Sequence, residues 1–421
     1  MKKHHLTKYI SLLCLICILA QLLCACGEKQ PAETTTSTTE GTENTTTATE
    51  INPAFLPLTE NGKVRYRVIR PEVPSKSALD TALAVHAYIK EISGITPDID
   101  TDWVRRGGNP DEMSEYELLV GETNRTASSA ALGEITGDTW CVSMVDNRIV
   151  INASTSFLLD DALEYFKSIC VMVDGVLMLD TSKCKVEVMP NVLIDADLTL
   201  RVGSYNIKNG GDVNHDMSII AEDIKALDLD IIGLQEVDIK TNRAKKLDTL
   251  KLLAEATGYE YYQFAKAIDF QGGGYGTAIL SRYPIVNYET VALDTASGYE
   301  ARACGHARIE VNGVEIDFFN THLSYEKKEL RDVQFAQLAD LAVPCRGYIV
   351  TGDFNTANLN EFKVFTDSEL VNEGKYATFP SSSSAIDNIV LESGWKITDS
   401  GMVATKHSDH NLLWAEIHYE G

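Results

Sequence analysis

The sequence predicts an α+β protein whose larger part is a four-layer α/β sandwich, two packed mixed β-sheets flanked by helices. From residue 196 to residue 421, short apolar runs of strand character recur, joined partly by helical patterns and partly by hairpins. This alternation favours a two-layer sheet core with helices outside it. From residue 55 to residue 190, a shorter series of patterns predicts a smaller α+β accessory domain. The chain of 421 residues is long enough for both.

The first residues predict a targeting segment that is not part of the fold. Three lysines, Lys2, Lys3 and Lys8, accompany an apolar run that ends in Leu23-Cys24-Ala25-Cys26. This ending resembles a bacterial lipobox, which implies cleavage before Cys26 and lipidation of that cysteine. Residues 1–26 are therefore expected to be a lipoprotein signal peptide that leaves the protein extracytoplasmic and anchored to the bacterial membrane. An ordinary signal peptide and an uncleaved anchor are the alternatives.

Residues 27–54 are rich in Thr and Glu and contain few apolar side chains until their last positions. Such a composition cannot bury enough surface to fold, so a disordered tether is expected. Five cysteines remain after it, an odd number without a CxxC spacing. A zinc site is therefore not expected, and the sequence assigns no disulfide.

The accessory domain, residues 55–190, is expected to contain a helix capped by Ser77 that ends before Gly94, and a hairpin that turns at Asp146-Asn147. It resembles the accessory domain at the N-terminus of some secreted glycan-degrading enzymes. The resemblance depends on three short motifs: Tyr66-Arg67-Val68-Ile69, Gly94-Ile95-Thr96-Pro97 and Leu119-Val120-Gly121-Glu122-Thr123-Asn124-Arg125. Because this segment shows no catalytic cluster, a spacer or packing role is favoured over glycan binding.

Polar residues follow most of the predicted strands between residues 196 and 421. The strands expected are Thr199–Tyr205, Asp230–Leu234, Thr277–Ser281, Val314–Phe319, Gly347–Val350, Ile386–Leu391 and Leu412–Tyr419. Any one polar end, such as Gly352-Asp353-Phe354-Asn355, is also typical of a turn. Together they supply carboxylates, amides and two histidines but no thiol, which predicts a cluster at one rim. Oxygen ligands suit Mg²⁺ or Mn²⁺, and a partly hydrated hard cation commonly binds phosphate.

The segment 196–421 resembles the endonuclease/exonuclease/phosphatase superfamily, which has the deoxyribonuclease I-like fold. The matching motifs occur in the family's order and cover a little over half of the chain. They are Ser204-Tyr205-Asn206-Ile207, Leu234-Gln235-Glu236-Val237, Tyr275-Gly276-Thr277-Ala278-Ile279-Leu280-Ser281-Arg282, Asn320-Thr321-His322-Leu323, Gly352-Asp353-Phe354-Asn355, Ile386-Asp387-Asn388-Ile389 and Ser408-Asp409-His410.

The resemblance implies a role for each candidate site residue. The metal ligands implied for Mg²⁺ (or Mn²⁺) are Glu236, with Asn206 beside it and Asp409 near the ion. The implied catalytic residues are His410 at the scissile phosphate, Asp387 orienting it, Asp353 acting on the attacking water, and Asn355 and His322 holding phosphate oxygens. Arg302 lies where the family often has a phosphate-binding arginine.

These residues predict a membrane-tethered, metal-dependent phosphoesterase that hydrolyses a phosphodiester or phosphomonoester. A secreted endonuclease or exonuclease with the same site is the first alternative, and a non-catalytic binding protein on this fold is the second. The net charge of −24 disfavours nucleic acid, because duplex-binding proteins usually carry a basic surface. A lipid or small-molecule phosphoester is therefore the expected substrate class, and the oligomeric state stays open.

Overall fold

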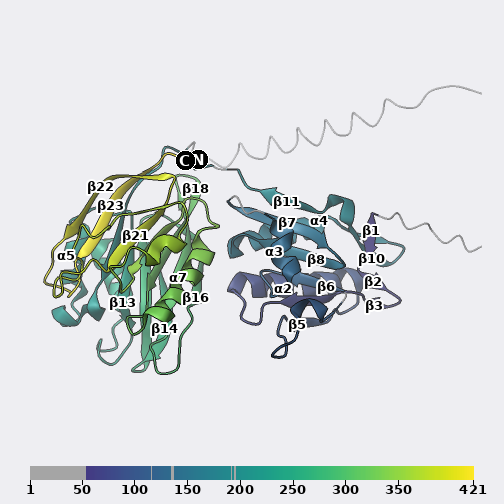
Figure 1. The fold of residues 1–421 in the computed structure, drawn as a ribbon, viewed down its shortest axis with the longest axis horizontal. Coiled ribbons are helices and arrows are strands. Elements are labelled where there is room, and N and C mark those ends of the chain that lie inside the picture. The colour runs from purple at the N-terminus through teal and green to yellow at the C-terminus, as the bar shows by residue number, and fades with distance from the viewer. Residues whose placement is uncertain (1–53, 115, 134–136, 191, 194–195) are drawn as a thin grey trace, which may run out of the picture. The chain divides into compact units, whose positions relative to one another are not determined.

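The computed structural model describes residues 54–421 except 115, 134–136, 191 and 194–195 (Figure 1). The expected signal peptide, Cys26 and nearly all of the expected tether lie outside the described residues. No helix within the described ranges is long and apolar enough to cross a membrane.

The N-terminal described segment has two main sheets and three α-helices. One sheet has the strand order β11-β7-β8-β6-β4-β5, the other has the order β1-β10-β9, and β2 pairs with β3. The strands are β1 Phe55–Pro57, β2 Thr59–Glu60, β3 Lys63–Val64, β4 Arg67–Arg70, β5 Ile99–Thr101, β6 Glu117–Val120, β7 Thr139–Val145, β8 Arg148–Ala153, β9 Cys170–Val173, β10 Val176–Asp180 and β11 Lys185–Val188. The helices are α2 Lys76–Ser93, α3 Thr126–Leu132 and α4 Leu159–Ser168.

Two local expectations for this segment can be compared with the structure. The hairpin is present, since β7 and β8 pair antiparallel around Asp146, which has a φ of +53°. The predicted cap of α2 is wrong, because Ser75 caps the helix by accepting a hydrogen bond from the Ala78 backbone N–H. The buried face of α2 consists of Ala78, Thr81, Ala82, Val85 and Ile89, whereas Leu83 and Ile92 are exposed.

The C-terminal described segment contains two six-stranded mixed sheets. The first has the order β14-β15-β13-β12-β23-β22 and the second has the order β16-β17-β18-β19-β21-β20. Each sheet has one parallel pair, β12 with β13 and β18 with β19, and its other pairs are antiparallel. These sheets bear out the expected mixed α/β core.

The elements of this segment have the following bounds. The first sheet contains β12 Thr199–Asn206, β13 Ile231–Ile239, β14 Tyr261–Phe270, β15 Gly273–Ser281, β22 Trp395–Val403 and β23 Leu412–Tyr419. The second contains β16 Ile285–Ala292, β17 Ala303–Val311, β18 Val314–His322, β19 Ile349–Asp353, β20 Ser368–Leu370 and β21 Asp387–Glu392. The helices are α5 Met217–Lys225, α6 Thr249–Thr257 and α7 Lys328–Ala342.

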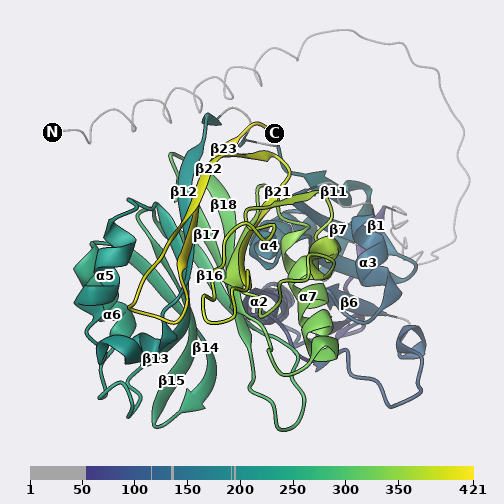
Figure 2. The ribbon, with the colours of Figure 1, turned by 60° about the vertical axis from the view of Figure 1, so that its left-hand side comes forward.

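Three apolar clusters hold these elements together. One contains buried side chains of both six-stranded sheets, among them Val202 and Ile231 from the first and Phe318 and Ile349 from the second. Another joins the first sheet to α5 and α6, and a third joins the second sheet to α7. Figure 2 shows α5 and α6 beside strands of the first sheet. Burial of these clusters is the main force that positions the strand ends described below.

Several strands extend further than predicted and include the polar residues expected after them. β18 continues to His322 and β19 continues to Asp353. His322 pairs in register with Asp353, and Asp353 pairs in register with Asp387 on β21. The sheet ladder therefore places three predicted site residues side by side on neighbouring strands, because the polar residues keep their backbone hydrogen bonds.

Candidate active site

Asp353 lies at the centre of the predicted site residues. Its Oδ2 accepts a hydrogen bond from Asn206 Nδ2 at 3.0 Å and lies 3.5 Å from His322 Nε2 and 3.6 Å from His410 Nε2. Its Oδ1 accepts the Asn355 backbone N–H at 2.9 Å. Burial raises the pKa of Asp353, and the neighbouring Asp387 carboxylate raises it further. One carboxylate therefore meets an amide from the first sheet and imidazoles from two other segments.

His410 is held by Asp387 through a buried hydrogen bond. His410 Nδ1 lies 2.8 Å from Asp387 Oδ2, and both side chains are almost fully buried. Burial lowers the pKa of His410, but the carboxylates of Asp387 and Asp353 outweigh burial and raise it to about 9. The Asp387 contact leaves His410 Nε2 facing Asp353, so the imidazole is oriented to exchange a proton at that atom.

Glu236 projects from an irregular point of β13. The pairing of β13 with β15 shifts between Leu234 and Val237, and Glu236 has a φ of +58°. A left-handed φ is uncommon for a residue other than glycine, and together with a bulge it commonly marks a functional site. Glu236 Oε1 accepts a hydrogen bond from Asn206 Nδ2 at 3.2 Å. Burial raises the pKa of Glu236 although this amide lowers it.

Asp409 lies beside Lys208 at the solvent-accessible edge of the site. The Lys208 ammonium is 3.2 Å from Asp409 Oδ2 and 3.2 Å from Asp212 Oδ2. The Asp409 side chain is 37% exposed, in contrast to the buried carboxylates of Asp353 and Asp387. Burial raises the pKa of Glu236, and the negative charge of Asp409 raises it further.

His322 and Asn355 lie beside Asp353, and Arg302 lies near His322. His322 is buried, and burial together with the charges of Arg302 and His410 lowers its pKa well below the usual value. The Asn355 amide donates to the Leu323 carbonyl at 2.9 Å, which fixes its orientation. Arg302 is 4% exposed and lies 2.8 Å from Glu300, and its Nε has no hydrogen-bond partner among the described residues. The buried, unsatisfied Nε is available to an anion.

Several supporting residues were missed by sequence reasoning. Asn320 donates to the carbonyls of Leu234 and Ala278 at 2.8 Å each and accepts from Gln235 at 2.7 Å, so it connects the second sheet to the first directly below the site. Asn320 was visible as part of a motif, but a side chain that bonds to another sheet's backbone leaves no pattern in the sequence. A Cβ on Gly233 would overlap the side chains of Thr351 and Asn320, so the sheets approach too closely here for any larger residue.

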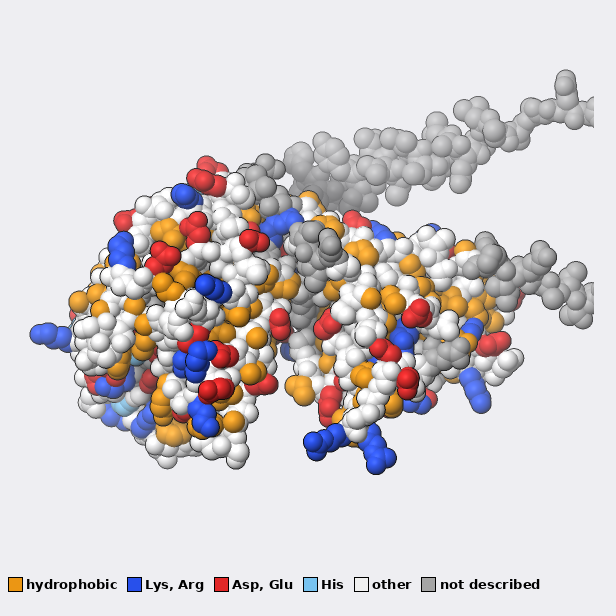
Figure 3. Space-filling model, viewed as in Figure 1, with side chains coloured by type: hydrophobic (Ala, Val, Ile, Leu, Met, Phe, Trp, Pro, Cys, Tyr) orange, Lys and Arg blue, Asp and Glu red, His pale blue; other side chains and the backbone are white. Residues whose placement is uncertain are grey.

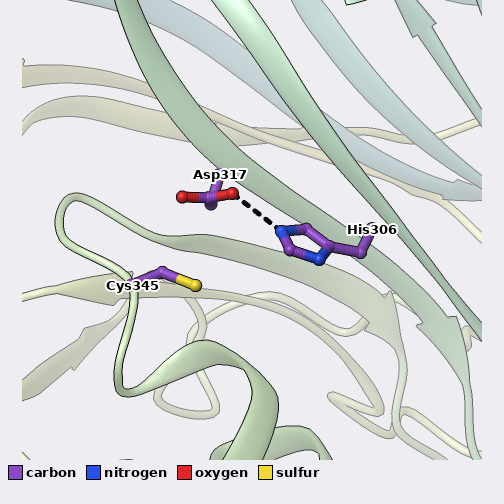
Figure 4. Close-up of side chains that lie close together, drawn as sticks. All are labelled: His306, Asp317 and Cys345. Atoms are coloured by element: carbon purple, nitrogen blue, oxygen red, sulfur yellow. Dashed lines mark hydrogen bonds and ion pairs between the residues drawn. The ribbon is translucent and has the colours of Figure 1, made fainter. Parts of the chain in front are cut away.

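A second cluster of titratable side chains lies elsewhere, at His306, Asp317 and Cys345, and Figure 4 shows the ring directed toward the carboxylate. His306 Nε2 is 2.7 Å from Asp317 and Nδ1 is 3.2 Å from Glu289. Both ring nitrogens are therefore bound by carboxylates. Burial lowers the pKa of His306, but the two carboxylates outweigh burial, so the pKa is raised. An imidazole without a free lone pair does not suit a metal ion, so this cluster is a buried ion-pair network.

The donor set around Glu236 fits a hard divalent cation. Glu236, Asn206, Asp409 and Asp353 offer oxygen atoms, the ligands that Mg²⁺ and Mn²⁺ prefer. Glu236 is partly buried and is repelled by the Asp409 carboxylate, so a cation would offset this repulsion. Asn206 Oδ1 already accepts the Lys208 backbone N–H at 3.0 Å, and only its second lone pair remains for a cation. Asp353, Asp387 and His410 also lie within reach of one another, but Asp387 and His410 are bound together.

Comparisons with known proteins place this segment in a family. Residues 203–410 match the sequence model of the Endonuclease/Exonuclease/phosphatase family. Similar solved structures include an endonuclease/exonuclease/phosphatase from Beutenbergia cavernae, with 20% identity, a TM-score of 0.47, and coverage of 53% of this chain and 72% of that chain. The mannosyl-6-phosphatase Bt3783 of Bacteroides thetaiotaomicron has 22% identity and a TM-score of 0.41, with coverage of 52% of this chain and 99% of that chain. Truncated TDP2 of Caenorhabditis elegans has 17% identity and a TM-score of 0.42, with coverage of 53% of this chain and 99% of that chain. A search of curated proteins found no match.

The matched range contains all nine predicted metal, phosphate and catalytic residues, from Asn206 to His410. The structure brings Asn206, His322 and His410 together around Asp353, with Glu236 bound to Asn206 and Asp387 bound to His410. The segment 203–410 of this chain therefore belongs to the endonuclease/exonuclease/phosphatase family.

Proposed function

We propose that this protein is a membrane-tethered, metal-dependent phosphoesterase that hydrolyses a lipid-borne or small-molecule phosphoester. Members of the family are metal-dependent phosphoesterases. The observation that carries the proposal is the convergence on Asp353 of Asn206, His322 and His410, with Asp387 bound to His410. The four-layer arrangement expected from the sequence is part of the same proposal.

The side chains of the site are suited to the steps of phosphoester hydrolysis. Asp353 has a raised pKa and no Lys or Arg partner among the described residues, so its carboxylate can accept a proton from an attacking water near neutral pH. His410, with its pKa raised by Asp387 and Asp353, can donate a hydrogen bond or a proton from Nε2. A divalent cation held by Glu236, with Asn206 and Asp409, would supply charge stabilisation to the phosphoryl oxygens.

Phosphate oxygens would be held by Arg302, His322 and Asn355. Arg302 is buried with its Nε unsatisfied, and His322 lies close enough for the guanidinium to lower its pKa. A neutral His322 can donate one hydrogen bond to a phosphate oxygen without carrying a charge that must be desolvated. The backbone of Asn355, with a φ of +53°, turns the chain directly after Asp353 and fixes this wall of the site.

The basic residues near the site favour a small substrate over duplex nucleic acid. Arg243 is bound to the buried Asp238 at 2.6 Å, Lys245 donates to Asn214, and Lys246 donates to backbone carbonyls. Lys208 is bound by Asp212 and Asp409. On the face that Figure 3 shows, Lys and Arg side chains lie mostly singly and near Asp or Glu. Arg243 and Lys208 are already neutralised by carboxylates, so they would displace few counterions from a polyanion.

The sequence motif at Cys26 supports an extracytoplasmic location on the bacterial membrane, and that location would bring a lipid-borne phosphoester within reach. Lipid chains on Cys26 would hold the protein through buried methylenes, and two or more chains are needed for stable anchoring. Nuclease activity is the alternative function that uses the same site. A non-catalytic binding protein is disfavoured because the predicted metal, phosphate and catalytic residues are all present.

The test is a measurement of kcat/KM on small phosphodiesters, phosphomonoesters, a phosphate-bearing lipid and plasmid DNA, each with Mg²⁺ at two salt concentrations. The sample is the chain from Asn52 onward. We expect the fastest reaction on a small or lipid-borne phosphoester, with little dependence on salt. Efficient DNA cleavage that falls steeply with salt would establish the nuclease alternative instead. Failure on every substrate class would leave the binding-protein alternative.

A further inference from the structure

Asp223 lies outside the catalytic cluster, on helix α5, yet it receives hydrogen bonds from two of the three segments that carry the candidate metal ligands. Its Oδ2 accepts from the Tyr205 hydroxyl at 3.0 Å and from the Thr405 hydroxyl at 2.7 Å. His407 Nδ1 lies 3.0 Å from the same oxygen and 3.1 Å from Oδ1. The Asp223 side chain is 11% exposed, and no Lys or Arg of the described residues pairs with it.

The donors to Asp223 flank the site residues in sequence. Tyr205 is fully buried and directly precedes Asn206 on β12. Thr405 and His407 belong to the loop between β22 and β23, which also carries Asp409 and His410. One buried carboxylate therefore joins the strand end with Asn206 to the loop with Asp409 and His410.

Besides its contacts with Asp223, the loop is attached to β12 through Ser408. The Ser408 hydroxyl donates to the Asn206 backbone carbonyl at 2.7 Å and accepts the His410 backbone N–H at 3.3 Å. Thr405 accepts the His407 backbone N–H at 3.0 Å, which shapes the turn before Ser408. Asp409 itself has only the solvent-accessible Lys208 as its ion-pair partner among the described residues. Asp223 holds the Thr405 hydroxyl and the His407 ring from outside the loop, whereas the Thr405 backbone N–H donates to Asn411 Oδ1 at 3.1 Å within the loop itself.

We propose that Asp223 is a positioning residue, which fixes the loop 404–411 so that Asp409 and His410 face Glu236 and Asp353. This inference rests on the proposed function of the site and extends it to a residue that touches neither substrate nor cation. A charge-assisted hydrogen bond is stronger and more directional than a neutral one, and Asp223 provides three acceptor contacts at a single point. Loss of that point would misplace the two loop residues together.

The test compares Asp223→Asn with a matched change on the same helix. Asp216→Ala removes the N-cap of α5, where Asp216 accepts the Ser218 N–H at 3.1 Å, and it does not touch the loop. In the full chain, Asp223→Asn should weaken Mn²⁺ binding at least about tenfold and lower kcat more than it raises KM, as loss of a partner behind a ligand does. Asp216→Ala should lower Tm while Mn²⁺ affinity and kcat remain those of the wild type. Asp223→Glu should restore part of both losses.

Hydrogen exchange separates failure of this inference from failure of the proposed function. Amides of residues 404–411 should exchange faster in Asp223→Asn than in the wild type, whereas Asp216→Ala should affect α5 without affecting the loop. If Asp223→Asn has the same amide exchange rates, Mn²⁺ affinity and kcat as the wild type, Asp223 does not position the loop. If the wild type neither binds Mn²⁺ nor hydrolyses a phosphoester, the proposed function fails, and faster loop exchange would still support the positioning role. Where Asp223→Asn does not fold, Thr405→Val removes one of the three contacts and the same readouts apply.

Discussion

At the scale of single residues, the site contains carboxylates that differ in burial and in their charged or hydrogen-bonding partners. Asp353 is fully buried without a Lys or Arg partner among the described residues, Asp387 is bound to His410, and Asp409 is exposed beside Lys208. A raised pKa at one carboxylate beside a histidine with a raised pKa is typical of groups that exchange protons. Glu236 differs again, because it projects from a bulge toward the amide of Asn206.

Glu236→Gln should weaken Mg²⁺ or Mn²⁺ binding at least about tenfold, because it removes a charge from the proposed ligand set. Activity at low metal concentration should fall accordingly, and excess metal should partly restore it. Calorimetric titration with Mn²⁺ and activity as a function of metal concentration check this. Glu260→Gln, a change at an exposed position, is the control and should leave both unchanged. Lost activity without weaker binding and without rescue would point to proton transfer at Glu236 instead.

Asp387 and His410 should behave as one unit. Asp387→Asn and His410→Gln are each expected to lower kcat/KM by at least about 100-fold, because either change removes the oriented imidazole. The double variant should lose little more than either single variant, since residues that act together are not additive. The three values form a double-mutant cycle, and a double loss equal to the product of the single losses would show that the two residues act independently.

At the scale of elements, sequence motifs at strand ends identified residues that lie together in the structure. The contacts and the bulge that position these residues left no sequence pattern. His322, Asp353 and Asp387 could be found because apolar strands precede or follow them. The bulge at Glu236 could not, because Leu234-Gln235-Glu236-Val237 contains no glycine and reads as a regular strand end. Asp223 resembles any solvated helix position until the loop at Thr405 is placed against it.

The neighbouring strands β17 and β18 carry the buried network of His306, Arg308 and Asp317, which should make stability depend on acid pH. Burial would raise the pKa of Asp317, but the Arg308 guanidinium and the His306 ring outweigh burial and lower it to about 2. An acid with a lowered folded pKa contributes stability above its unfolded pKa of about 4 and loses it as pH falls toward 2. That contribution is about 2 kcal/mol at neutral pH, from a shift of nearly two pKa units.

Asp317→Asn should therefore lower the free energy of unfolding by at least about 2 kcal/mol at pH 7, and more where Arg308 is left unpaired. The difference between variant and wild type should shrink between about pH 4 and pH 2, because the wild-type carboxylate becomes protonated there. Urea unfolding at several pH values measures this difference in the free energy of unfolding. Glu310→Gln, an exposed position on β17, is the control and should change little. A difference that stays constant down to pH 2 would contradict the lowered pKa.

At the scale of the whole molecule, an acidic chain combines a segment of the endonuclease/exonuclease/phosphatase family with an N-terminal α+β segment and an expected lipid anchor. The net charge of −24 and the paired cations near the site both disfavour a polyanionic substrate. The sequence predicted the membrane location from the ending Leu23-Cys24-Ala25-Cys26 alone, and those residues lie outside the described part of the chain. The location is therefore tested in cells.

Cys26→Ser should release the protein from the membrane when it is expressed in a bacterium that processes lipoproteins, because no acylated cysteine then remains at the mature N-terminus. Cys24→Ser, two residues earlier in the same segment, is the matched control and should stay membrane-bound. Quantitative immunoblots of membrane and medium fractions measure the distribution. A wild-type protein found entirely in the medium, with an N-terminus other than Cys26, would show that the segment is an ordinary signal peptide.

The central claim, a phosphoesterase whose chemistry depends on Asp353, is tested most directly by comparing the wild type with Asp353→Asn. The measurement is kcat/KM on a small phosphodiester with Mg²⁺, paired with Tm of the metal-free proteins. The raised pKa of Asp353 means that its charged form is unfavourable in the fold, so Asp353→Asn should keep or raise Tm. Activity should fall by at least about 1,000-fold, because both the proton acceptor and the positioning of the water are lost. Full activity of Asp353→Asn with an unchanged Tm would contradict the claim.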